Sequence, residues 1–214
     1  LGIEQDTLVT FISDNGGPTM PGVTINGSRN DPLRGSKRTT LEGGIRVPFL
    51  LAWPGRIKPG VFEAPTIQLD LHATALAAAG LPVKPAWQIE GVNLLPYLSG
   101  ERTGPPHAAL CWRFGEQMAI RAGDFKLVRY DLNADTRTGA PRQGVTAARL
   151  YNLRDDIGET KDLAAALPDK VKELQAQWDT WNTANVAPLW GGGRVATGRA
   201  EPDVPAKKKK RKAQ

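Results

Sequence analysis

Apolar and polar residues alternate in blocks along the first half of the chain. Residues 7–12, TLVTFI, are apolar and β-branched, which predicts a short strand buried on both faces. A polar segment with seven glycines runs from residue 13 to residue 44, and a loop that long in a compact domain usually serves a function. Residues 47–55, VPFLLAWPG, predict a second buried strand, and residues 66–79 predict a helix that stops at Gly80. Buried strands joined by loops and helices favour an α/β fold.

The pattern changes after a break at residues 99–106, SGERTGPP. Four short apolar runs follow, HAALCWRF, QMAIRAG, FKLVRYD and ARLYNL, and each predicts a strand. Pro168 then opens a predicted helix, whose apolar stripe consists of Val171, Leu174, Trp178 and Trp181. This second half is therefore expected to be a small α+β unit, with a four-stranded antiparallel sheet and one amphipathic helix covering a face of it.

These patterns predict three regions. Residues 1–104 form an α/β part, residues 105–186 form the α+β unit, and residues 187–214 form a Gly-, Pro- and Lys-rich tail that is expected to be disordered. No apolar run approaches the length of about 18 residues that a membrane span needs. The oligomeric state cannot be inferred from these patterns.

The net charge of the chain gives little information about its function. The net charge is +6, but residues 207–212 alone carry six cations, and the remainder holds 22 basic and 22 acidic residues. A folded basic face is the usual mark of a nucleic-acid-binding domain, so no nucleic-acid partner is expected. The single cysteine, Cys111, lies in an apolar stretch and is interpreted as a buried, inert thiol.

The first predicted strand runs directly into Ser-Asp-Asn-Gly-Gly, residues 13–17. Asp-Asn-Gly is a common turn sequence. A metal site is the other interpretation, because Gly16 and Gly17 permit a sharp bend that points the oxygens of Asp14 and Asn15 into one crevice. Carboxylate and amide oxygens suit Ca²⁺ or Mg²⁺, but Ca²⁺ takes six to eight ligands, so two donors are too few.

Further motifs follow this turn in order. They are PLRGSK at residues 32–37, TLEGGIRVPF at 40–49, WPG at 53–55, MAIRAGDFKLVR at 118–129 and LYNLRDDIGETKDLA at 150–164. Together with SDNGG, this set resembles the sulfatase family over roughly residues 1–184. The resemblance implies the C-terminal part of an alkaline-phosphatase-like sandwich, with a mixed, mostly parallel sheet and flanking helices, followed by the α+β unit.

The resemblance also implies roles for particular residues. Asp14 and Asn15 match two of the family's calcium ligands, and Lys37 matches the lysine that contacts the substrate sulfate. An ammonium group can neutralise charge that develops on sulfuryl oxygens. The expected partner is a sulfated small molecule or a sulfated carbohydrate. Family members of bacterial type are commonly exported, which implies a periplasmic or extracellular setting.

Family sulfatases use a formylglycine made from Cys or Ser in a C/S-x-P-S/T-R motif, and this chain has no such motif. We therefore expect the chain to be the C-terminal portion of a sulfatase, inactive alone, whose nucleophile and remaining metal ligands lie upstream. Two alternatives stay open. One is a phosphate or phosphonate ester hydrolase of the same superfamily, and the other is a non-catalytic, degenerate module.

Other conspicuous residues receive structural interpretations. Glu42 and Arg46 are expected to shape the return from the loop into the second strand, and His72 is expected to be a structural histidine on the predicted helix with Asp70. A catalytic role is not favoured for His107. Trp112 and Arg113 are candidates for the border of a substrate pocket, although core packing is the favoured interpretation for Trp112.

Overall fold

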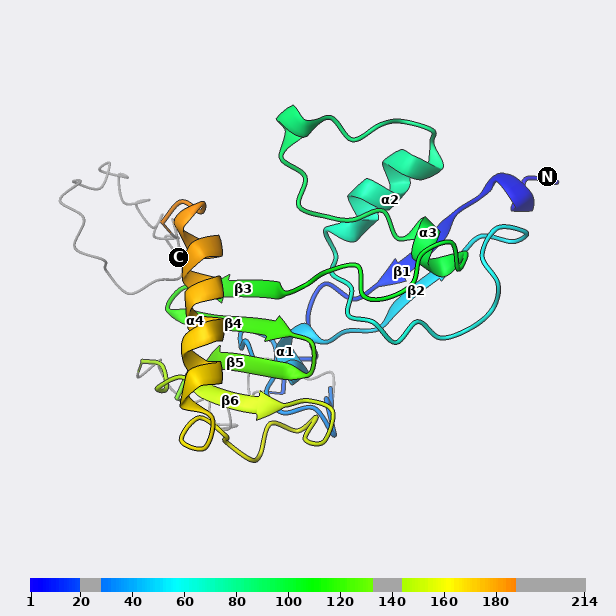
Figure 1. The fold of residues 1–214 in the computed structure, drawn as a ribbon. Helices are drawn as coiled ribbons and strands as arrows, with labels where there is room; N and C mark the ends of the chain where they lie inside the picture. The colour runs from blue at the N-terminus through cyan, green and yellow to red at the C-terminus, as the bar shows by residue number, and fades with distance from the viewer. Residues whose placement is uncertain (20–27, 133–143, 188–214) are drawn as a thin grey trace, which may run out of the picture.

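The computed structural model describes residues 1–19, 28–132 and 144–187 (Figure 1). The elements in chain order are η1 (Glu4–Asp6), β1 (Val9–Ile12), α1 (Glu42–Ile45), β2 (Phe49–Ala52), α2 (Asp70–Ala78), η2 (Pro85–Trp87), α3 (Leu95–Leu98), β3 (Leu110–Phe114), β4 (Gln117–Ala122), β5 (Phe125–Arg129), β6 (Arg149–Asn152) and α4 (Pro168–Thr183). Every predicted strand and both predicted helices are present. The short helix α1, inside the glycine-containing loop, was not predicted.

The first two strands form an antiparallel pair, in which Phe11 lies opposite Leu50. The mostly parallel sheet implied by the resemblance is therefore not present among the described residues of this part. The prediction that β1 is buried on both faces was also wrong, because its Val9 and Phe11 side chains are 56% and 60% exposed. Leu50, opposite Phe11 in β2, is 59% exposed. An apolar run reports only that its residues can be buried, whereas burial itself needs covering elements, and no described segment covers this face.

The second sheet has the order β3-β4-β5-β6, with every neighbouring pair antiparallel. This confirms the predicted four-stranded antiparallel sheet. Because side chains alternate along a strand, β5 directs Leu127 to one face and Lys126 and Val128 to the other.

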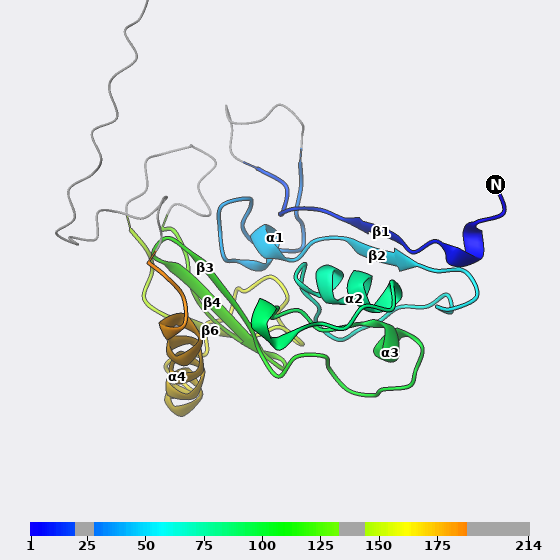
Figure 2. The same ribbon diagram turned by 90° about the horizontal axis from the view of Figure 1, so that it is seen from above.

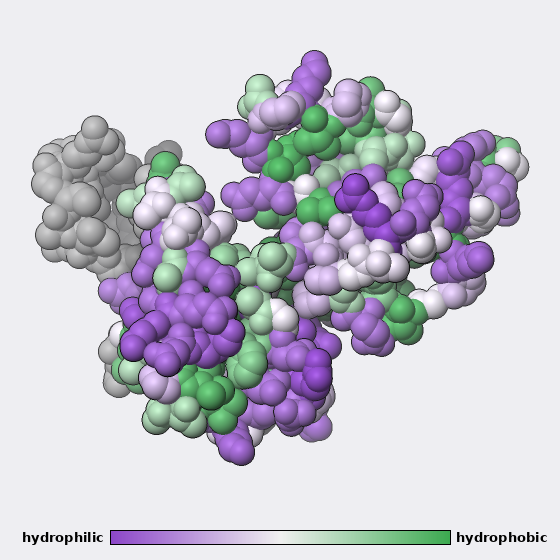
Figure 3. Space-filling view, viewed as in Figure 1, coloured by the Kyte–Doolittle hydropathy of each residue, from purple (hydrophilic) through white to green (hydrophobic). Residues whose placement is uncertain are grey.

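Helix α4 covers one face of this sheet (Figure 2). Leu174 is fully buried there in a cluster with Met118, Ile120, Leu127 and Leu150, and Val171 and Trp178 pack against its edge. The indole Nε1 of Trp178 donates to the carbonyl oxygen of Trp112 over 3.1 Å. Figure 3 shows that the opposite, solvent side of α4 is largely hydrophilic.

The other face of the sheet is covered by the segment that contains α1. A second buried cluster there joins Leu41 of that segment to Ala119, Val128, Tyr130, Tyr151 and Leu153 of the sheet and its extensions. In Figure 2, α1 and α4 lie on opposite sides of the sheet. Leu41, next to α1 at the end of the glycine-containing loop, is thus part of the core of the second half.

The division of the chain at residues 104 and 105 stays a prediction. The predicted disordered tail lies outside the described residues, apart from Ala187. Across the three described ranges, no helix has the length and apolar character that crossing a bilayer requires.

Candidate active-site segment

The chain bends sharply where β1 ends, and the bend brings the side chains of Asp14 and Asn15 together. Asn15 Nδ2 lies 3.1 Å from Asp14 Oδ1 and 3.2 Å from the carbonyl oxygen of Gly16. Ser13 Oγ donates to the carbonyl oxygen of Asn15 over 2.9 Å, and Gln68 Nε2 donates to the carbonyl oxygen of Asp14 over 2.9 Å. Hydrogen bonds within the turn, together with one from Gln68 before α2, therefore hold the turn in this conformation.

Gly16 is the point at which this turn meets α1. Its amide donates to the carbonyl oxygen of Gly44 over 2.9 Å. A Cβ atom on Gly16 would lie 1.7 Å from the carbonyl oxygen of Gly43, which no side chain can tolerate. Glycine is required here by the close approach of two backbones.

Lys37 lies on a turn next to the same bend. Its amide donates to the carbonyl oxygen of Gly17 over 3.4 Å. Asn30 strengthens this junction, since its side chain bonds both the amide and the carbonyl oxygen of Gly17, at 2.9 and 2.8 Å, and the carbonyl oxygen of Gly35 at 3.0 Å. The Lys37 side chain is exposed and has no hydrogen bond or ion pair within the described part of the chain.

The donor set at the bend fits two positions of a hard-cation shell. Asp14 supplies a carboxylate, and rotation of the Asn15 amide by half a turn would place its oxygen beside that carboxylate, an arrangement that a cation would favour. Without a cation the amide nitrogen faces Asp14 Oδ1 and the carbonyl oxygen of Gly16, which are both acceptors. Within residues 1–19, 28–132 and 144–187, no three His, Cys, Asp or Glu side chains are grouped to hold a metal ion.

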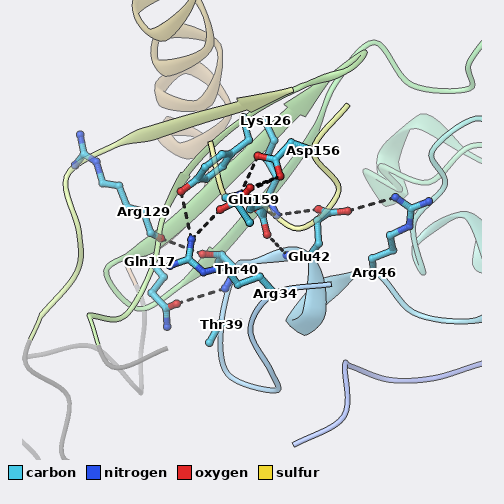
Figure 4. A network of polar contacts seen from close by, with 12 residues as sticks. Arg34, Thr39, Thr40, Glu42, Arg46, Gln117, Lys126, Arg129, Asp156 and Glu159 are labelled. Atoms are coloured by element: carbon cyan, nitrogen blue, oxygen red, sulfur yellow. Dashed lines mark hydrogen bonds and ion pairs between the residues drawn. The ribbon is translucent and has the colours of Figure 1, made fainter. Parts of the chain in front are cut away.

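A buried charged cluster lies between α1 and the four-stranded sheet (Figure 4). Lys126 Nζ of β5 lies 2.8 Å from Glu42 Oε1 and 2.9 Å from Glu159 Oε1, and the Lys126 and Glu159 side chains are fully buried. Glu159 Oε2 accepts a hydrogen bond of 2.6 Å from the Glu42 amide. Burial raises the pKa of Glu159 above its ordinary value, and the Lys126 ammonium opposes that rise.

Arg34 joins the same cluster from the loop. Its guanidinium donates to the carbonyl oxygen of Glu159 over 2.8 Å and to the Tyr130 hydroxyl over 2.9 Å. It also lies 4.9 Å from the centre of the Tyr130 ring, within range of a cation–π contact. The loop is therefore held to the sheet by charge-assisted hydrogen bonds as well as by apolar packing.

Gln117 and Thr40 fasten the remaining edge of the loop. Gln117 Nε2 donates to the carbonyl oxygen of Arg38 over 2.8 Å. Thr40 Oγ1 donates to the carbonyl oxygen of Arg129 over 2.9 Å (Figure 4). Arg34, Glu42, Lys126 and Glu159 come from four different motifs of the sequence, which the fold brings to one place.

Sequence reasoning missed this cluster. Glu42 was assigned only to the shape of the chain return, while Lys126 and Glu159 were not singled out. A signal was available, because Lys126 interrupts an otherwise apolar strand run, F-K-L-V, at a position that alternation places on the same face as Val128. A lysine on a buried face requires a partner carboxylate.

The sequence predicted His72 as a structural histidine, but the structure gives a buried partner to His107 instead. His72 is exposed on α2, whereas His107 has the structural partner. His107 Nε2 lies 2.9 and 3.0 Å from the two carboxylate oxygens of Asp70, which also accept hydrogen bonds from the amides of Val92 and Ile67. Asp70 is fully buried, so this pair attaches the segment before β3 to the start of α2.

Trp112 and Arg113 of β3 both make contacts within the described part of the chain, and their place at a pocket border stays a prediction. Trp112 contacts the cluster around Leu41, in agreement with the favoured interpretation. Arg113 donates to Asn182 Oδ1 over 2.5 Å and to the carbonyl oxygen of Val186, next to the end of α4.

Burial, with a smaller contribution from Glu90, raises the pKa of the Cys111 thiol to about 11. Cys111 is half-buried rather than fully buried, and the raised pKa of its thiol agrees with the inert character that the sequence predicts.

Comparison with known proteins places these features in context. Residues 1–81 match the family model described as Sulfatase. The chain is 35% identical to arylsulfatase A of Bos taurus over 191 residues, which covers 82% of this chain and 37% of that protein. It is 33% identical to arylsulfatase A of Homo sapiens over 217 residues, which covers 92% of this chain and 42% of that protein.

Solved structures also include proteins that are similar to this chain. The fold is similar to the crystal structure of Ps i-CgsB in complex with k-i-k-neocarrahexaose, with a TM-score of 0.71 and 27% sequence identity. That match covers 87% of this chain and 39% of the other. The chain therefore spans about two fifths of the length of the proteins that it matches.

Proposed function

This chain belongs to the sulfatase family, and we propose that it supplies part of the active site of an enzyme that hydrolyses sulfate esters. One observation carries the proposal. The bend that holds Asp14 and Asn15 and the turn that holds Lys37 are in backbone contact, because the Lys37 amide donates to the carbonyl oxygen of Gly17. Two oxygen donors and one cationic side chain thus belong to a single local structure.

The residues divide the chemistry between them. Asp14 and Asn15 would hold a divalent cation, Ca²⁺ in the first instance, together with ligands from outside this chain. When bound, the cation polarises the sulfuryl oxygens as a Lewis acid. Lys37 would donate to the same sulfate group and stabilise the negative charge that grows on it as the ester bond breaks, and its exposed ammonium is free to do so.

The nucleophile is not assigned to any residue of this chain. A sulfatase of this family uses a formylglycine, and the motif that generates one does not occur in the sequence. The chain's own residues therefore bind and orient the ester and stabilise charge, and the covalent step is left to a residue that a longer protein would provide.

A sulfated carbohydrate is the substrate class that we favour. The support is the similarity of 27% identity to Ps i-CgsB, whose crystal structure holds k-i-k-neocarrahexaose. An exported, periplasmic or extracellular setting is part of the same proposal.

The function is tested with nitrocatechol sulfate. In a protein that carries these residues together with the family's nucleophile segment, Lys37→Ala should lower kcat/KM by about 10²–10³, the usual loss for one charge-stabilising donor. Lys58→Ala, at another exposed lysine, should leave kcat/KM unchanged. The 214-residue chain alone should show no turnover.

Two results would contradict the proposal. Equal losses in the Lys37→Ala and Lys58→Ala variants would remove Lys37 from the sulfate site. Faster turnover of the matching phosphate ester than of the sulfate ester would favour a phosphate ester hydrolase of the same superfamily.

A further inference from the structure

We propose that the buried cluster of Glu42, Lys126 and Glu159 is a positioning device that sets how the bend at residues 13–17 lies against the turn at residues 35–38. The inference deepens the proposed function and rests on it, because those two segments carry Asp14, Asn15 and Lys37. None of the three cluster residues is assigned contact with substrate or metal.

The first step is that the cluster fixes α1. Glu42 is the first residue of that helix, and its side chain and its amide are both held, by Lys126 Nζ at 2.8 Å and by Glu159 Oε2 at 2.6 Å. Two contacts at one residue define orientation as well as position. Arg46 Nη1, one turn later, lies 3.7 Å from Glu42 Oε2 and adds a weaker restraint.

The second step is that α1 fixes the bend. The four-residue helix places the carbonyl oxygen of Gly44 where it accepts the Gly16 amide at 2.9 Å. The required absence of a Cβ on Gly16 shows that the two backbones are in direct contact. A shift of α1 would therefore be transmitted to Asp14 and Asn15 without an intervening flexible side chain.

The third step is that the same cluster fixes the turn of Lys37. The carbonyl oxygen of Arg34 accepts the Gly43 amide at 2.7 Å, while its guanidinium donates to the carbonyl oxygen of Glu159 at 2.8 Å. Asn30 then connects Gly35 to Gly17, which joins the two site segments. Both segments are thereby connected, through α1 and Arg34, to the buried cluster around Lys126 of β5.

Charged groups suit this task better than apolar ones. An apolar cluster of equal volume would fill the space between α1 and the sheet, but dispersion contacts are not directional. Buried ion pairs add little net stability, so their presence is better explained by the specific geometry that they impose. Lys126 and Glu159 are fully buried, which keeps water from competing for these bonds.

The test is amide hydrogen exchange, measured by NMR on the 214-residue chain with no metal added. In Glu159→Ala, exchange at the Gly16 and Gly43 amides should become roughly tenfold faster, the effect of losing one buried hydrogen bond. Amides of Ile120 and Leu127 in the sheet should speed up less than those of Gly16 and Gly43. Glu159→Gln should give an intermediate rate, because its amide oxygen can still accept the Glu42 amide.

Leu174→Ala is the matched control for a purely structural effect. This residue is fully buried on the α4 face of the sheet and has no contact with α1. Its loss should speed exchange in the sheet without a selective effect on Gly16. Unchanged Gly16 exchange in Glu159→Ala, or a uniform increase in both regions, would overturn the inference.

If the Glu159→Ala variant does not fold, a second measurement on the wild-type chain tests the inference. The amides of Gly16, Glu42 and Gly43 should open as one unit, with a common dependence on low urea concentrations, and separate dependences would overturn the inference. Because no cation or substrate is present, this result does not depend on the proposed function. A failure of that function would appear only in metal and ester assays.

Discussion

The amide of Gly16 donates to the carbonyl oxygen of Gly44 over 2.9 Å, so the bend after β1 rests directly on the backbone of α1. No side chain separates the two segments, since a Cβ on Gly16 would lie 1.7 Å from the carbonyl oxygen of Gly43. The position of the proposed cation ligands is therefore set by a backbone contact between segments that are distant in sequence.

Gly16→Ala is expected to destabilise the chain by about 1–3 kcal/mol, the usual cost of forcing an extra carbon into packed structure. Urea denaturation followed by circular dichroism would measure the change in the free energy of unfolding. Gly60→Ala is the matched control, because a Cβ at Gly60 would have no neighbour within 4 Å. Equal stability of the two variants would contradict the close approach at Gly16.

Lys126→Met is expected to lower the free energy of unfolding by about 3–5 kcal/mol, because it removes the cation beside the buried Glu159 carboxylate and leaves Glu42 only the longer contact with Arg46. Lys172→Met offers a matched comparison, since Lys172 and Asp169 form a surface pair with side chains 79% and 94% exposed. That pair should contribute nothing measurable. A Lys126→Met variant as stable as Lys172→Met would show that the buried cluster is not held by charge.

The sequence predicted the second half of the fold better than the first. The strands β3 to β6 are short apolar runs separated by turn residues and α4 has a clear apolar stripe, so local patterns were sufficient there. The direction and exposure of β1 and β2 depend on what packs against them, which an apolar run does not encode. The short helix α1 has two glycines in four residues, and tertiary contacts rather than propensity hold it.

The candidate site was likewise predictable from the sequence only in part. Asp14, Asn15 and Lys37 were found because their residue types stand in recognisable motifs, and their assigned roles stay predictions. Lys126 and Glu159 were missed because 33 residues separate their positions in the chain and their meeting depends on the register of β5 and the path of the segment after β6.

The exposed face of the β1–β2 pair gives a further prediction. Phe11→Ser should change the free energy of unfolding by less than about 0.5 kcal/mol, because that side chain is already largely in water. Leu127→Ala should cost about 2–5 kcal/mol, since Leu127 is fully buried beneath α4. Thermal denaturation of both variants is the measurement, and a large loss for Phe11→Ser would contradict the exposure of this face.

Cys111 should react slowly with thiol reagents. Burial raises the pKa of its thiol from 9.0 to about 11, so at pH 8 the thiolate fraction falls by about two orders of magnitude relative to an unfolded chain. The rate of reaction with Ellman's reagent at pH 8, compared with and without urea, measures this difference. Similar rates in the two conditions would contradict the protected thiol.

The central claim, that Asp14 and Asn15 form part of a divalent-cation site, is tested most directly by titrating Ca²⁺ into the ¹⁵N-labelled chain. NMR shifts should concentrate at residues 14–17 and follow a weak affinity, about millimolar, because two protein oxygens fill only part of the shell. The shifts should vanish in Asp14→Ala and persist in Asp169→Ala, which removes an exposed surface carboxylate. Shifts that survive in Asp14→Ala, or no shifts at residues 14–17, would contradict the claim.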